Sequence, residues 1–224
     1  AVFDGDIVSL GGRYVLSARL ITAQDGGQLA AFKEEAESQN DLIPAIGRLA
    51  KQLRSKAGES LKSVREATAL DRVTTSSLEA LRKYAAANRL QETTFDYTQV
   101  NPLLEEAVAI DSTFAMAWRR LAQNYSNTQQ FQRARNAAVQ AYRYADRLSE
   151  VERQLTIASY YSLGPEPDDE KVLAAYQAAL ARDSLNYIAL NNASLILANR
   201  RELEKAEEYR LKAAAQPGTS PISW

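Results

Sequence analysis

The sequence predicts a mainly α-helical protein, an α-solenoid of about four helix pairs that follows a small β-hairpin and a long helix. Alanines recur late in helical segments at Ala107, Ala141, Ala179 and Ala213, with separations of 34, 38 and 34 residues. A repeat of this length is typical of antiparallel helix pairs that stack in series. Near the N-terminus, hydrophobic residues instead alternate with a period of two around an Asp-Gly turn, which is typical of a hairpin.

The composition is that of a globular protein and excludes several classes of function. The 224 residues carry 27 basic and 28 acidic side chains, and 46% are hydrophobic. A net charge of -1 argues against a nucleic-acid binder, which would show a basic excess. The chain has neither cysteine nor histidine, so it lacks disulfides, thiolate ligands and the commonest general base.

No apolar run approaches the length of about 18 residues that a membrane-spanning helix needs. We therefore expect no direct membrane insertion by this chain. Because the sequence begins at Ala1 without a methionine and within a strand-like pattern, we expect it to be a fragment of a longer protein. The absence of a targeting signal therefore leaves its compartment open between the cytoplasm and the far side of a membrane.

The first predicted segment covers residues 1–66 and begins with strands. Arg13–Thr22 alternates with a period of two, and Gln28–Glu37 can return as its partner after the Asp25-Gly26 turn. Asp6–Leu10 is a weaker third strand. A helical stripe follows, with Asp41 as its expected cap and Pro44 in its first turn. The stripe consists of Leu42, Ile46, Leu49, Leu53, Ala57, Leu61 and Val64.

This strand-turn-strand-helix run resembles the C-terminal half of the TolB-like domain found before tetratricopeptide repeats in many bacterial regulatory proteins. The resemblance is carried by the strand Gly11–Leu20 and by the run Asp41-Leu42-Ile43-Pro44-Ala45-Ile46. It implies an incomplete TolB-like domain, which a linker over residues 67–76 joins to the repeats. Because two or three strands with one helix are marginally stable alone, the segment must pack on other residues or on another molecule.

The region 77–218 resembles an array of four tetratricopeptide repeats, with approximate bounds 77–111, 112–146, 147–183 and 184–218, before a tail over residues 219–224. The second repeat matches best. Its first helix places Trp118, Leu121, Ala122 and Tyr125 where the family pattern has a large aromatic residue, Leu, a small residue and Tyr. Its second helix carries Ala134, Ala138 and Ala141 at packing positions.

The first repeat diverges, as a terminal capping repeat does. Asn88 and Gln91 replace the expected small residue and Tyr, and Asn101-Pro102 is expected to delay or kink the second helix. Ser76 with Glu79, and Ser149 with Glu152, are predicted capping boxes at the starts of two other helices.

A string running from Gly58–Leu61 through Thr74–Leu81 to Phe114–Trp118 resembles the C-terminal regions of bacterial serine/threonine kinases that carry tetratricopeptide repeats. The chain itself has no glycine-rich loop, His-Arg-Asp or Asp-Phe-Gly motif of a kinase domain. The resemblance therefore implies a sensor or recruiting region of a larger signalling protein rather than its catalytic part.

Tetratricopeptide arrays present the first helix of each repeat along a concave surface, where peptides often lie. Guanidinium and carboxamide groups there suit a peptide carboxylate or acidic side chains. The competing interpretation of each such residue is ordinary solvated helix surface. The candidate peptide-binding residues are Arg82, Arg89, Arg119, Arg120, Gln123, Asn191 and Asn192.

We therefore expect a non-catalytic scaffold that binds a protein or peptide, with no cofactor, no metal and no nucleic-acid partner. One alternative is a homo-oligomerisation element acting through the incomplete sheet. A remote alternative is a metal-dependent enzyme that uses only carboxylates, such as Glu105-Glu106 or Asp168-Asp169-Glu170. The simpler interpretation of the last run is an acidic start of the helix near Lys171, which the helix dipole favours.

Overall fold

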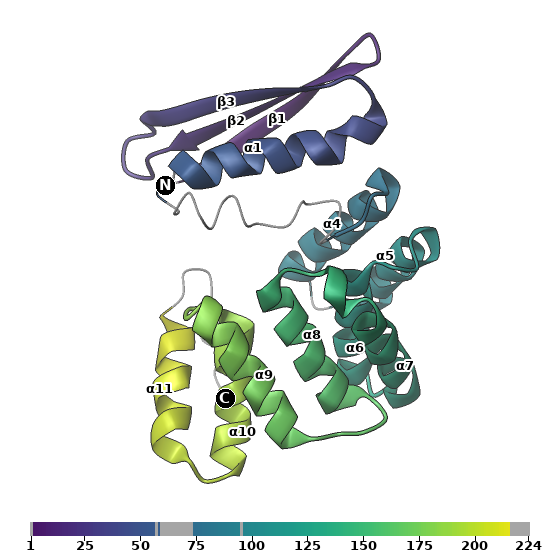
Figure 1. Cartoon of the computed structure of the whole chain (residues 1–224), viewed down its shortest axis with the longest axis vertical. Helices are drawn as coiled ribbons and strands as arrows, with labels where there is room; N and C mark the ends of the chain where they lie inside the picture. Colours follow the sequence, from purple (N-terminus) through teal and green to yellow (C-terminus); the bar gives the residue numbers. More distant parts are fainter. Residues whose placement is uncertain (1, 57, 59–73, 95, 216–224) are drawn as a thin grey trace. The chain divides into compact units, whose positions relative to one another are not determined.

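The computed structural model describes residues 2–56, 58, 74–94 and 96–215 of the chain (Figure 1). The chain divides into two compact units, Ala1–Arg82 and Lys83–Trp224, and the division falls within helix α4 (Leu78–Thr93). A three-stranded sheet with one helix precedes a series of paired helices. The predicted fold class is confirmed.

The sheet is antiparallel, with the order β1 (Val2–Leu10), β2 (Arg13–Ile21) and β3 (Gln28–Ala36). The strands β2 and β3 form the predicted hairpin. The N-terminal strand β1 is longer than the predicted Asp6–Leu10, because every residue from Val2 to Leu10 pairs with β2.

Helix α1 (Leu42–Lys56) packs against β2 and β3. Its residues Leu42, Ala45 and Leu49 are buried in the same core as Leu16 and Ala18 of β2. The buried face of the strand and the buried face of the helix, both predicted from the sequence, therefore pack against each other. Ala57, Leu61 and Val64 of the predicted stripe lie outside the described residues.

The expected cap Asp41 instead ends a short 3-10 turn (Gln39–Asp41) that precedes α1. Its carboxylate accepts a hydrogen bond of 2.7 Å from the Ser38 hydroxyl.

The strand β1 is largely uncovered in the described part of its unit. It occupies one edge of the sheet, whereas α1 packs on the other two strands. Its five large apolar side chains are between 46% and 60% exposed. They are Val2, Phe3, Ile7, Val8 and Leu10.

In the described residues, α4 opens a series of four helix pairs, each joined by a short connection. The remaining helices are α5 (Tyr97–Ile110), α6 (Ala115–Asn127), α7 (Phe131–Arg143), α8 (Glu150–Leu163), α9 (Asp169–Arg182), α10 (Tyr187–Asn199) and α11 (Leu203–Ala214). The pairs α6–α7, α8–α9 and α10–α11 pack closely. The four spaced alanines, Ala107, Ala141, Ala179 and Ala213, are all buried, because a methyl side chain lets neighbouring helices approach.

Capping follows the sequence at several helix starts. Ser149 caps α8 by accepting from the Glu152 N–H at 3.5 Å, which is one of the two hydrogen bonds of the predicted capping box. Asp168 caps α9 by accepting from the Glu170 and Lys171 N–H groups, at 3.0 and 3.1 Å. The Lys171 N–H holds the pKa of Asp168 below its usual value, because a hydrogen-bond donor favours the charged carboxylate.

Of the predictions about the first pair, the cap at Ser76 and the delay of the second helix at Asn101-Pro102 were wrong. Ser77, not Ser76, caps α4, because the Ser77 hydroxyl accepts from the Ala80 N–H at 3.2 Å. Pro102 does not delay α5. That helix begins at Tyr97 with Asp96 as its cap, and it contains Pro102 in its interior.

Candidate functional site

A groove of about 390 Å³ lies in the unit Lys83–Trp224 and is lined by α4, α6, α8 and α10, the first helices of the four described pairs (labelled in Figure 1). One residue of α9, Tyr176, completes it. The polar side chains that line this groove are Gln91, Arg119, Arg120, Gln123, Asn124, Glu152, Ser159, Ser162, Asn191 and Asn192.

Most of the candidate binding residues lie in this groove. Arg119, Arg120 and Gln123 line it from α6, and Asn191 and Asn192 line it from α10. By contrast, the structure places Arg82 and Arg89 on exposed positions of α4 that are not among the lining residues. Arg82 belongs to the Ala1–Arg82 unit.

Arg119 is held by an ion pair with Glu152, which joins α6 to α8. The two side chains are only 17% and 29% exposed. The Glu152 carboxylate therefore reaches Arg119 across the groove, while the Ser149 cap uses the Glu152 backbone. The Nε atom of Arg119 is buried and has no hydrogen-bond partner.

Arg120 is held differently. Its Nε and Nη2 atoms both donate to Asn88 Oδ1 of α4, at 3.2 and 2.9 Å. Asn88, which stands where the sequence analysis expected a small residue, thus positions a guanidinium at the groove. Within the described ranges no carboxylate forms an ion pair with Arg120. The groove lining carries two guanidiniums and one carboxylate, a net charge of +1.

A chain of amide side chains lies beneath the α4–α6 part of the groove. Gln91 Nε2 donates to Asn124 Oδ1 at 3.2 Å, and Asn124 Nδ2 donates to Asn101 Oδ1 at 2.9 Å. Asn124 and Asn101 are buried. Asn124 was missed by the sequence analysis, although it lies one residue after Gln123 and one before the packing residue Tyr125.

Asn191 and Asn192 form a second polar group at the α10 wall. Asn191 Nδ2 donates to Asn192 Oδ1 at 3.3 Å, and Asn192 Nδ2 donates to the Tyr176 hydroxyl at 3.2 Å. Burial raises the pKa of Tyr176, although the Asn192 hydrogen bond and the nearby Arg119 charge oppose this rise. Tyr187 and Ile188, which were also missed, add half-exposed apolar surface beside these amides.

Several buried polar atoms at the groove have no hydrogen-bond partner among the described residues. In the part of the chain that the structure describes, three buried side-chain atoms have no partner: Gln91 Oε1, Arg119 Nε and Ser159 Oγ. All three belong to residues that line the groove. Buried polar groups are normally paired with protein atoms or with ordered water, so these three atoms have hydrogen-bonding capacity that water or a ligand in the groove can use.

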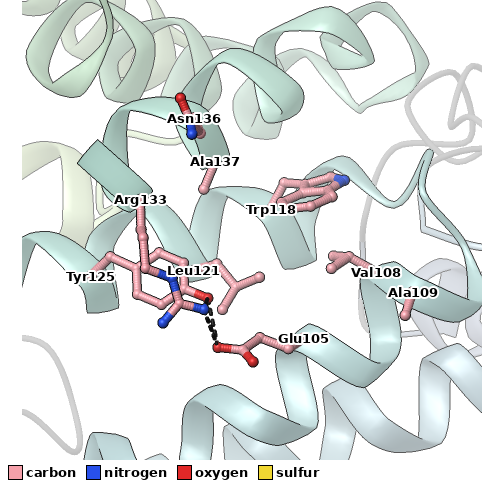
Figure 2. A pocket seen from close by; sticks show the side chains of 9 residues that line it. All are labelled: Glu105, Val108, Ala109, Trp118, Leu121, Tyr125, Arg133, Asn136 and Ala137. Carbon is pink, nitrogen blue, oxygen red and sulfur yellow. Dashed lines mark hydrogen bonds and ion pairs between the residues drawn. The ribbon is translucent and has the colours of Figure 1, made fainter. Parts of the chain in front are cut away.

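A second pocket, also about 390 Å³, lies between α5, α6 and α7 (Figure 2). Tyr125 Oη donates to Glu105 Oε1 at 2.7 Å, and Arg133 Nη2 lies 2.8 Å from both of these oxygens. Burial and the Glu105 hydrogen bond raise the pKa of Tyr125. Glu105, Tyr125 and Arg133 already have partners within this cluster. The rest of the lining consists of Asn136, whose Oδ1 accepts from Gln132, and of apolar side chains that include Leu121 and Trp118.

The described residues show neither a metal-binding cluster nor a membrane-spanning helix. Among them, no group of three or more acidic side chains is arranged to hold a metal ion. None of their helices combines the length and the apolar character that crossing a membrane requires.

No protein-family model matches the chain, and no curated protein is significantly similar to it. Its structure is similar to solved structures of MamA, among them the "MamA RS-1 ArsTM double mutant" and MamA from residue 41 to its end from Desulfovibrio magneticus RS-1. Both have a TM-score of 0.38 and 14% identity, and they cover 80% of this chain and 95% and 96% of their own. A likeness at this level assigns neither a family nor a function.

Proposed function

We propose that the chain is a non-catalytic protein-interaction module that binds a peptide or protein segment in the groove lined by α4, α6, α8 and α10. The observation that carries the proposal is that one groove collects side chains from the first helices of all four described pairs. It combines carboxamides, a guanidinium without an acidic partner and exposed apolar side chains. Such a mixture suits a segment that is held by a few anchors.

We further propose that the module is part of a larger bacterial regulatory protein. The support is the sequence resemblance of its first segment to a TolB-like domain, and of the string between Gly58 and Trp118 to the repeat-bearing regions of serine/threonine kinases. In that setting the groove recruits a substrate or senses a signal, while catalysis resides in another part of the protein.

A selection from a displayed library of random dodecapeptides tests the groove. We expect wild-type chain to enrich a family of peptides, and Ile188→Asp to weaken the binding of synthetic copies by about tenfold or more, because a charge there removes an apolar anchor. Fluorescence anisotropy measures the affinities.

Leu195→Asp is the matched control, because Leu195 lies on the same helix, is 43% exposed against 40% for Ile188, and does not line the groove. If the selected peptides bind both variants as tightly as they bind the wild type, they bind outside the groove. If the wild-type chain enriches no peptide, the proposal is wrong.

A second candidate function is self-association through the N-terminal sheet, and the exposed apolar side chains of β1 favour it. An edge strand with such side chains is a template for pairing with another chain. We expect light scattering to give the mass of a dimer for wild type and of a monomer for Ile7→Lys, with Phe131→Lys as an exposed control on α7. A wild-type monomer at all concentrations would rule this candidate out.

A further inference from the structure

We propose that the partner segment presents a single carboxylate to Arg120 and an apolar side chain to Tyr187 and Ile188, and that Glu152 keeps Arg119 from accepting a second acid. This inference rests on the proposed function, since it names the chemistry of the segment that the groove binds. It also distinguishes between two neighbouring arginines that the sequence alone treats alike.

The partner of each guanidinium decides which arginine is available. Asn88 is neutral and accepts from two of the five N–H groups of Arg120, so the charge of this guanidinium is not compensated. The Asn88 contact also fixes the side chain, which lowers the entropy lost when a ligand binds. A carboxylate would form short, charge-assisted hydrogen bonds with the remaining N–H groups.

The charge of Arg119, unlike that of Arg120, is already neutralised by Glu152, although its Nε atom has no hydrogen-bond partner among the described residues. A second carboxylate near Arg119 would have to displace Glu152 or lie beside its negative charge. Like charges at a binding site oppose association and select against the wrong partner. The lining charge of +1 therefore matches a segment with one acidic group in the groove.

The apolar part of the segment follows from the other wall. Tyr187 and Ile188 belong to the first turn of α10, line the groove and are 37% and 40% exposed. Leu155 and Leu163 of α8 line the same groove. Apolar side chains that are half exposed in a concave site are suited to contact an aliphatic or aromatic anchor of a partner.

The test uses the peptides selected by wild-type chain and repeats the selection with Arg120→Gln and Glu152→Gln. We expect the wild-type selection to be enriched in peptides with one Asp or Glu near an apolar residue. The Arg120→Gln selection should lose the acid preference, and the Glu152→Gln selection should gain peptides with two acids. Thermal unfolding of each variant reports whether it is folded.

A second measurement needs no variant of the protein. On wild-type chain, changing the acid of a selected peptide to its amide should weaken binding by about tenfold or more, the loss expected for a charged hydrogen bond. Adding a second acid beside the first should not strengthen binding.

Enriched peptides without an acid, or an acid preference that persists in Arg120→Gln, would overturn the inference and leave the proposed function intact. A wild-type preference for two acids would overturn the role of Glu152. If neither the wild-type chain nor any variant enriches a peptide, the proposed function fails as well.

Discussion

Replacing Phe114 with alanine should cost the unit Lys83–Trp224 about 3–5 kcal/mol of unfolding free energy. Phe114 is fully buried at the start of α6, and its ring centroid lies 4.9 Å from that of Tyr84 on α4. The truncation removes the apolar contact and leaves a cavity between these helices. Since domains are stable by about 5–15 kcal/mol, the loss is a large fraction of the total. Urea unfolding followed by circular dichroism at 222 nm measures it.

Phe131→Ala is the matched control because it deletes the same atoms from a side chain that is 67% exposed at the start of α7. Its unfolding free energy should change by less than about 0.5 kcal/mol. Equal losses in the two variants would mean that residue type, and not burial between α4 and α6, sets the cost.

The helical part of the fold was predictable because close packing imposes a period on the sequence. Where two helices approach closely, only a small side chain fits between them. This explains the regular spacing of four buried alanines, Ala107, Ala141, Ala179 and Ala213. The hairpin was predictable for a similar reason, since β2 buries Leu16, Ala18 and Leu20 on one face. The strand β1 was harder to recognise, because its apolar residues are exposed and give no such pattern.

The contacts at the candidate groove were not predictable from single helices, because each joins two different pairs. Arg119 binds Glu152, Arg120 binds Asn88, and Gln91 binds Asn124, with sequence separations of 33, 32 and 33 residues. These separations are close to one repeat. A comparison of polar residues about one repeat apart on the lining face of the first helices would have revealed them.

The sequence-based interpretation of Asn88 and Gln91 as departures from an expected repeat pattern missed their role. In the structure each side chain forms a hydrogen bond with a residue of α6. Polar contacts of this kind fix how α4 lies against α6. The local pattern records only that an apolar or small residue is missing.

The amide chain beneath the groove gives the second large expected effect. Asn124→Leu should lower the unfolding free energy by about 1–3 kcal/mol, because Asn101 Oδ1 loses its donor while it remains buried. Gln91 also loses an acceptor, although its side chain is partly exposed and can turn toward water. Urea unfolding measures the loss, with Gln123→Leu as the control on the adjacent, exposed position.

A double variant separates an unpaired buried group from a change in shape. Replacing both buried partners with leucine removes the orphaned acceptor, and apolar pairs of similar shape are often nearly neutral. Asn101→Leu with Asn124→Leu should therefore recover much of the stability that Asn124→Leu alone loses. If the double variant instead loses the sum of the two single costs, the site does not tolerate leucine. The hydrogen bond between Asn124 and Asn101 would then not be the source of the effect.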